Sequence, residues 1–182
     1  TDSIAFLYHG QSTREFEVPI AQERILIIGG SSGMGLGIAQ RLAKAGAEVF
    51  IAGRDRAKLD RAVASLEGPA AGVVADFTDA GSLGELMTRV ARLDHLVLAA
   101  GGGAAWGPFA QVAAQTLRRA IDYKLIGYWQ SLQAALPVLR RDGSVVMLTG
   151  AASRVAMTGT SGLAASSRRC GSTWFRPAWS TP

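Results

Sequence analysis

The sequence holds a single cysteine, Cys170, and only two histidines, His9 and His95. One cysteine cannot close a disulfide within the chain, and two isolated histidines offer no metal-ligand spacing. We therefore expect neither a structural disulfide nor a metal site. A reducing compartment, the cytoplasm, fits this composition best.

The N-terminus lacks a long apolar run. Its apolar segment covers only Ile4 to Tyr8 and has acidic residues close by, which is too short for a secretory signal or a membrane span. We expect residues 1–23 to form an irregular lead-in and the protein to have no membrane partner.

The body of the chain also lacks a basic stripe interleaved with aromatic residues. The formal net charge is +5, but Arg168, Arg169 and Arg176 lie in the last seventeen residues, which contain no acid. The sequence therefore gives no support for nucleic-acid binding. With 182 residues, 48% of them hydrophobic, the chain is most simply one domain with one ordinary core.

Glycine, by contrast, is abundant, and it forms one informative cluster. The segment from Ile25 to Ala39 passes from a β-branched apolar run into an amphipathic helix through Gly29, Gly33 and Gly35. Glycines at these points permit a tight turn, a close approach of the backbone to a pyrophosphate, and close packing of the helix on the strand. The helix N-terminus would then offer unpaired N–H groups and a positive dipole end to phosphate.

The spacing Gly-x-x-x-Gly-x-Gly resembles that of the short-chain dehydrogenase/reductase family, and the resemblance covers about residues 25–165. It implies a nicotinamide-dinucleotide site and, for the intact family, carbonyl reduction or alcohol oxidation with that cofactor. The cofactor-binding residues that it implies in this turn are Gly29, Ser31, Ser32, Gly33, Met34 and Gly35.

Strand and helix patterns alternate along the rest of the chain, which predicts an α/β fold, a Rossmann-type doubly wound parallel sheet with five strands. After the strand that begins at Ile25, the pattern predicts strands over 48–52, 71–75, 93–100 and 144–149 and helices over 55–66, 79–91 and 112–141. The last helix should end or kink at Pro137. Residues 24–165 would form the dinucleotide-binding domain.

Arg54 follows the second strand, where NADP(H) users of this family carry a basic residue. A cation there can pair with the 2′-phosphate, whereas an acid would accept a hydrogen bond from the free 2′-hydroxyl of NAD(H). The resemblance therefore favours NADP(H), and the alternative is a solvated loop charge. We expect Asp55 to be a helix N-cap and no ribose ligand.

Two further segments match the family's cofactor-binding landmarks. Asp76 lies where the family has an acid that holds the adenine, although a second N-cap is an equally good interpretation. Residues 98–101 stand where the family commonly has Asn-Asn-Ala-Gly. The match keeps Ala100 and the cofactor-wall glycine, Gly101, and loses both amides.

The family's catalytic Asn, Ser, Tyr and Lys are not intact. By spacing, these positions hold Lys124, Gly150, Leu163 and Ser167. Lys124 can in principle replace the proton donor if burial or a cationic nicotinamide lowers its pKa; the alternative is a helix lysine that extends into solvent. Tyr123 and Tyr128 are interpreted as packing residues.

Residues 166–182 show no helical period, so we do not expect them to form the helix that this fold requires there. Either an out-of-frame reading or a genuine short C-terminus would explain them, and we expect the sixth and seventh strands to be missing. The uncovered fifth strand and helix face predict a homo-oligomer. A non-catalytic dinucleotide-binding module and a defective product remain the alternatives to an active reductase.

Overall fold

The structure is a computed structural model that describes residues 20–101, 105 and 107–149. Its strands are β1 Arg24–Ile28, β2 Glu48–Gly53, β3 Ala70–Val74, β4 Leu93–Leu98 and β5 Leu139–Met147. Its helical elements are α1 Gly33–Lys44, α2 Arg56–Ala64, α3 Ala80–Val90, the 3-10 turn η1 Phe109–Gln111, α4 Ala114–Ile121, the π-helical turn η2 Asp122–Ile126 and α5 Gly127–Ala135.

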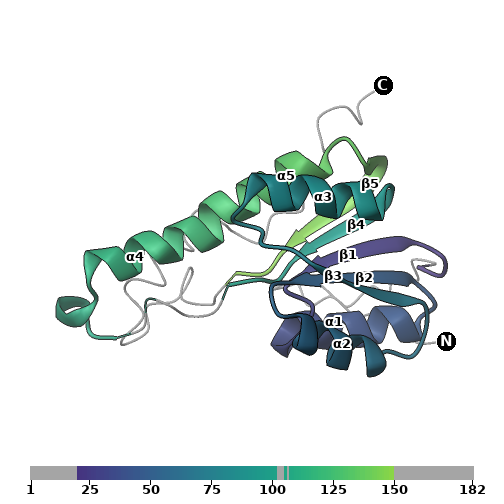
Figure 1. Cartoon of the computed structure of the whole chain (residues 1–182), viewed down its shortest axis with the longest axis horizontal. Helices are drawn as coiled ribbons and strands as arrows, with labels where there is room; N and C mark the ends of the chain where they lie inside the picture. The colour runs from purple at the N-terminus through teal and green to yellow at the C-terminus, as the bar shows by residue number, and fades with distance from the viewer. Residues whose placement is uncertain (1–19, 102–104, 106, 150–182) are drawn as a thin grey trace, which may run out of the picture.

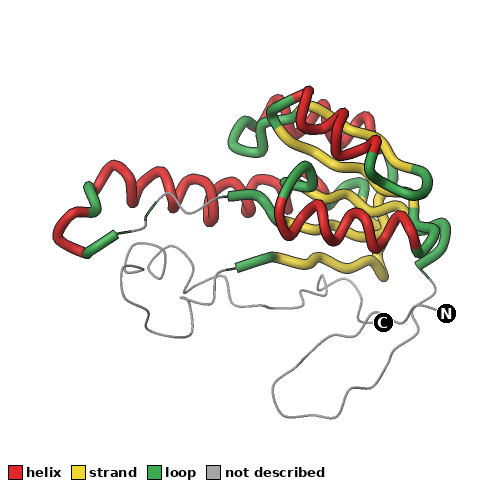
Figure 2. Tube along the Cα trace, turned by 90° about the horizontal axis from the view of Figure 1, so that it is seen from below, coloured by secondary structure: helices red, strands yellow, loops and turns green. Residues whose placement is uncertain are grey.

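The five strands form one parallel sheet in the order β3-β2-β1-β4-β5. Helices α1 and α2 cover one face, and α3 and α5 cover the other, so the chain is wound in both directions from β1 (Figures 1 and 2). The predicted Rossmann-type fold is confirmed. All strands end at the same edge of the sheet, which is where such folds bind their ligands.

Two apolar cores lie on the two faces of the sheet, because alternate strand residues point to opposite faces. On one face, Ile25 and Ile27 of β1 pack with Leu42 of α1 and Leu59 of α2. On the other face, Leu26 and its alternating neighbours pack with α3 and α5. Burial on both faces explains why the strands read as continuous apolar runs.

The helix predicted over 112–141 differs from the observed one at both ends and in the middle. Helix α4 begins at Ala114, and α5 ends at Ala135, where Pro137 prevents continuation. Between them, η2 forms one turn of π-helix. The N-terminal part of this long helix extends away from the sheet (Figure 1).

The π-helical turn also changes which side chains this helix buries. Three large apolar side chains in and after this turn are exposed: Leu125 by 36%, Ile126 by 44% and Trp129 by 62%. A π-turn inserts one residue into the helical repeat and so rotates the following residues. Tyr123 and Lys124 are directed toward the sheet instead, and both are only partly exposed.

Strand β5 begins at Leu139 instead of the predicted Ser144. Leu139 pairs with Leu93, and the register then shifts before Ser144 pairs with His95. At this bulge, a Cβ on Gly143 would lie 2.4 Å from the carbonyl oxygen of Asp94. The close backbone approach, which requires glycine, allows the strand to start early.

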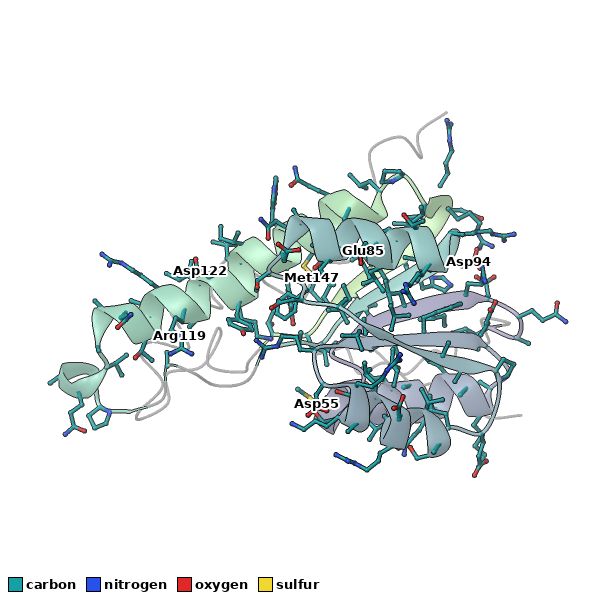
Figure 3. The ribbon with its side chains drawn as sticks, viewed as in Figure 1. Asp55, Glu85, Asp94, Arg119, Asp122 and Met147 are labelled. Carbon is teal, nitrogen blue, oxygen red and sulfur yellow. The ribbon has the colours of Figure 1, made fainter. Side chains whose placement is uncertain are left out.

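A charged cluster closes the amino edge of the sheet, centred on the buried Asp94 of β4 (Figure 3). Its carboxylate accepts the backbone N–H of Arg24 at 2.8 Å and contacts the guanidinium of Arg140 at 3.1 Å and that of Arg92 at 3.2 Å. Burial raises the pKa of Asp94, but these hydrogen bonds and positive charges outweigh it, and the pKa lies below its ordinary 3.8.

Replacement of Asp94 with asparagine is expected to lower the free energy of unfolding by about 2–4 kcal/mol at neutral pH, since two arginines lose their buried anion. The pKa of Asp94 is lower in the folded state than in the unfolded state. The carboxylate therefore contributes fully to stability at pH values above its unfolded pKa, and this contribution is lost as the pH falls through the folded pKa. Urea unfolding should therefore show a difference in the free energy of unfolding between the parent and Asp94→Asn, and this difference should become smaller in acid. Equal stability at neutral pH would contradict this account.

Candidate dinucleotide-binding site

The glycine turn after β1 brings three backbone segments together at the carboxyl edge of the sheet. Gly29 has φ +88°, and a Cβ there would lie 2.5 Å from the backbone nitrogen of Ala100. A Cβ on Gly35 would lie 2.2 Å from the carbonyl oxygen of Gly29. Gly33, with φ +55°, faces open space, with nothing within 4 Å of a Cβ built on it. The turn is therefore closely packed at Gly29 and Gly35 and open at Gly33, which is the shape that a bound pyrophosphate needs.

Gly35 and Gly37 offer a matched test of this packing. Gly35→Ala is expected to destabilise the fold by about 1–3 kcal/mol, since its methyl group meets backbone. Gly37 is exposed in the same helix with open space at its Cβ position, so Gly37→Ala is expected to stabilise the fold by about 0.5–1 kcal/mol. Thermal or urea unfolding measures both. Similar effects of the two substitutions would show that helix α1 does not depend on the close approach.

The first turn of α1 differs from those of α2 and α3. Asp55 and Asp79 cap α2 and α3 by accepting the N–H groups of Lys58 and Ser82, as expected for Asp55. Ser32 at the start of α1 makes no side-chain cap hydrogen bond. The positive end of α1 is therefore left to attract an anion. Ser31, Ser32 and the 70% exposed Met34 surround it.

The end of β2 lies directly beside this turn. A Cβ on Gly53 would lie 3.4 Å from the hydroxyl oxygen of Ser31. Arg54 follows, and its guanidinium donates a hydrogen bond to the hydroxyl of Tyr123 and lies 5.3 Å from the centroid of that ring. Arg54 is exposed, yet it is held by a partner and is no simple solvated charge.

Asp76 follows β3 but does not cap α3, so that interpretation of it is wrong. The cap is Asp79, because it stands directly before the first helical residue. The Asp76 carboxylate accepts the backbone N–H of Thr78 at 3.0 Å and its hydroxyl at 2.7 Å. Partial burial raises the pKa of Asp76, but these hydrogen bonds and the charge of Arg54 outweigh it, and the pKa lies below its ordinary value. The group is thus held as a half-buried carboxylate at the sheet edge.

Lys124 and Tyr128 meet at the carboxyl ends of β4 and β5. The Lys124 ammonium donates to the Tyr128 hydroxyl and to the carbonyl of Leu148, both at 3.0 Å. The buried Tyr128 hydroxyl donates to the carbonyl of Ala100 at 2.6 Å. Lys124 also lies against Gly101, which has φ +98°; a Cβ there would lie 3.1 Å from Lys124 Cε.

These contacts correct the interpretation of Lys124 as a lysine that extends into solvent, because its ammonium points to the sheet edge. Tyr123 and Tyr128 do pack on the core, as expected, but both hydroxyls also make hydrogen bonds that the sequence did not reveal. The only available signal was the spacing of four between Lys124 and Tyr128, which places two residues on one helix face.

The structure thus brings together the predicted turn residues, Arg54, Asp76, Ala100, Gly101 and Lys124 along one edge of the sheet. Gly150, Leu163 and Ser167, which stand at three of the family's catalytic positions, lie outside the described residues, as do the tail 166–182 and the lead-in up to residue 19. Among the described residues, no group of three or more His, Cys, Asp or Glu side chains could hold a metal ion. Over the same residues, none of the helices combines the length and apolar character needed to cross a membrane.

Comparison with known proteins places the chain in a family. The short chain dehydrogenase family model matches residues 23–167. A 3-dehydrosphinganine reductase of Arabidopsis thaliana is 31% identical over 132 residues, which cover 70% of this chain and 40% of that protein. Dehydrogenase/reductase SDR family member 4 of Rattus norvegicus is 30% identical over 143 residues, 74% of this chain and 51% of that protein.

Solved structures agree at the level of the fold. A putative short chain dehydrogenase from Escherichia coli CFT073 superimposes with a TM-score of 0.76 at 23% identity and covers 84% of this chain and 72% of that one. A short chain dehydrogenase/reductase family protein reaches a TM-score of 0.74 at 27% identity and covers 84% of this chain and 66% of that one. The chain spans about half the length of the curated relatives it matches. With this match over most of its length, the chain belongs to the short-chain dehydrogenase family of oxidoreductases.

Proposed function

We propose that residues 24–165 bind NADP(H) along the carboxyl edge of the sheet and serve the reduction of a carbonyl or the oxidation of an alcohol. The observation that carries this proposal is the continuity from the glycine turn to Arg54. Ser31 lies against Gly53, so a dinucleotide with its pyrophosphate at α1 meets the Arg54 cation at the end of β2. A guanidinium at this point matches the charge of a 2′-phosphate.

Each described residue has a distinct task in this proposal. The uncapped start of α1 and the open space above Gly33 receive the pyrophosphate. Asp76 and Ala100 border the adenine, while Gly101, which lets the Lys124 side chain approach the sheet edge, borders the nicotinamide half. When bound, NADPH supplies a hydride to the carbonyl carbon of a substrate. The Lys124 ammonium is held where it can give a proton to the resulting alkoxide.

Isothermal titration calorimetry with NADPH and NADH tests this proposal. We expect both cofactors to bind and NADPH to bind more tightly. Equal affinities would remove the argument for NADP(H), and absence of binding by either would remove the site itself.

A second candidate is a non-catalytic dinucleotide-binding module whose output is a protein interaction. It is favoured by the residues at the family's catalytic positions, where Lys124, Gly150, Leu163 and Ser167 replace the usual Asn, Ser, Tyr and Lys. Cofactor binding without turnover on a panel of carbonyl compounds would select this candidate. Turnover would select the first.

We also propose that the chain self-associates. Among the described residues, β5 pairs only with β4, and its free edge can pair with another chain. Leu125, Ile126 and Trp129 are exposed on the adjoining helix. Sedimentation at micromolar concentration is expected to show a dimer or larger species. A single monomeric species that melts cooperatively would contradict this expectation.

A further inference from the structure

Tyr123 connects Arg54 to two other elements of the site. Its hydroxyl accepts the hydrogen bond from Arg54 Nη1, and its ring lies beneath the guanidinium carbon. The ring packs edge-on against Phe77, with centroids 5.4 Å apart and an interplanar angle of 72°. The π-helical turn that contains Tyr123 thus reaches the ends of β2 and β3.

The position of this tyrosine is fixed by its packing. Phe77 is buried after β3, and a Cβ on Gly127 would lie 2.6 Å from its ring, so the glycine lets the helix approach Phe77 closely. Tyr123 also packs on the apolar core between the sheet and helices α3 and α5. A side chain held in this way can hold its own partner in place.

Arg54 needs such a partner because it is otherwise exposed. A free arginine side chain loses rotamer freedom on binding a ligand, and an arginine that is already positioned loses less. The neutral phenol occupies one of the guanidinium's five N–H donors and does not neutralise its charge. No described carboxylate forms an ion pair with Arg54, although its charge contributes to the lowered pKa of Asp76.

We propose that Tyr123 is a positioning residue that sets cofactor specificity, because it holds the Arg54 guanidinium ready for the 2′-phosphate of NADP(H). The inference rests on the proposed NADP(H) function and adds a residue from the opposite face of the sheet to it. The adenine and the pyrophosphate do not need this contact. Its contribution therefore falls on the phosphate-bearing cofactor alone.

Calorimetry of Tyr123→Phe with both cofactors tests the inference. The phenylalanine keeps the ring and its contact with Phe77 and removes only the hydroxyl. We expect NADPH affinity to fall about 2- to 10-fold, the cost of ordering one long side chain, while NADH affinity stays unchanged. The melting temperature with no cofactor present reports whether the fold is retained.

A double-mutant cycle with Arg54→Ala completes the test, because Tyr123→Phe should have no effect on either cofactor once the arginine is gone. If the parent prefers NADPH and Tyr123→Phe keeps the full preference, or strengthens it, the inference is overturned while the proposed function stands. If the parent binds neither cofactor, both are overturned. Equal loss of NADPH and NADH would show a structural role and would also overturn it.

Discussion

Arg54→Asp is expected to reverse the cofactor preference of this protein. One charge-assisted contact with the 2′-phosphate contributes about 1–3 kcal/mol, so the parent should bind NADPH about 5- to 150-fold more tightly than NADH. An aspartate at the same point repels that phosphate and accepts a hydrogen bond from the free 2′-hydroxyl. Calorimetric titration of the variant should therefore show weaker NADPH binding and unchanged or tighter NADH binding.

Arg61→Asp is a matched control for this charge reversal. Arg61 is exposed in the last turn of α2, so its replacement makes the same change in net charge away from the end of β2. The control variant should keep the preference for NADPH. If both substitutions reduced NADPH affinity equally, the effect would come from the change in the protein's net charge and not from a contact between Arg54 and the cofactor.

Local sequence signals were sufficient for the sheet and for the glycine turn. Parallel strands buried on both faces are short apolar runs in the sequence. The close approaches at Gly29 and Gly35 admit no side chain and so require glycine. The strands and the turn can therefore be recognised from the sequence. The N-cap at Asp55 is equally local. These features depend on residues that are neighbours in the chain.

The errors lie where distant segments decide the structure. Asp76 and Asp79 both have the character of an N-cap, and which one caps α3 depends on where β3 ends. The sequence predicts one continuous helix over 112–141, and nothing in that pattern shows that a π-helical turn will direct Tyr123 and Lys124 to the sheet. The bulge at Gly143 depends on Asp94, which is remote in the chain.

The hydrogen bonds of Lys124 illustrate the same limit within the site. Its partners are Tyr128, one helical turn away, and the carbonyl of Leu148 at the end of β5. The first could be inferred from spacing, but the second exists only because β4 and β5 end beside the helix. The sequence therefore indicated Lys124 as a candidate proton donor but could not show which way its side chain points.

The largest expected effect is on the rate of NADPH oxidation, because the family's catalytic residues are replaced in this chain. With Gly150 and Leu163 at the positions of the family's Ser and Tyr, we expect only the NADP(H)-binding part of the proposed function with ordinary ketones and aldehydes, and NADPH oxidation by them at background level, as for the non-catalytic candidate. Hydride transfer to a carbonyl leaves an alkoxide that needs a proton, and a positioned acid typically contributes about 10²- to 10⁴-fold to such a step. Absorbance of the reduced nicotinamide measures the rate across a substrate panel.

Robust turnover would contradict this expectation and would direct attention to Lys124, whose ammonium lies against Gly101. In that case Lys124→Met should abolish turnover while calorimetry still shows NADPH binding, because methionine keeps the aliphatic length and removes the transferable protons. Tyr128→Phe should then lower turnover less than Lys124→Met does, since it removes one of the contacts that position the ammonium and keeps the acid. Unchanged turnover in Lys124→Met would exclude the lysine as proton donor and would leave proton transfer to residues outside the described part of the chain or to water.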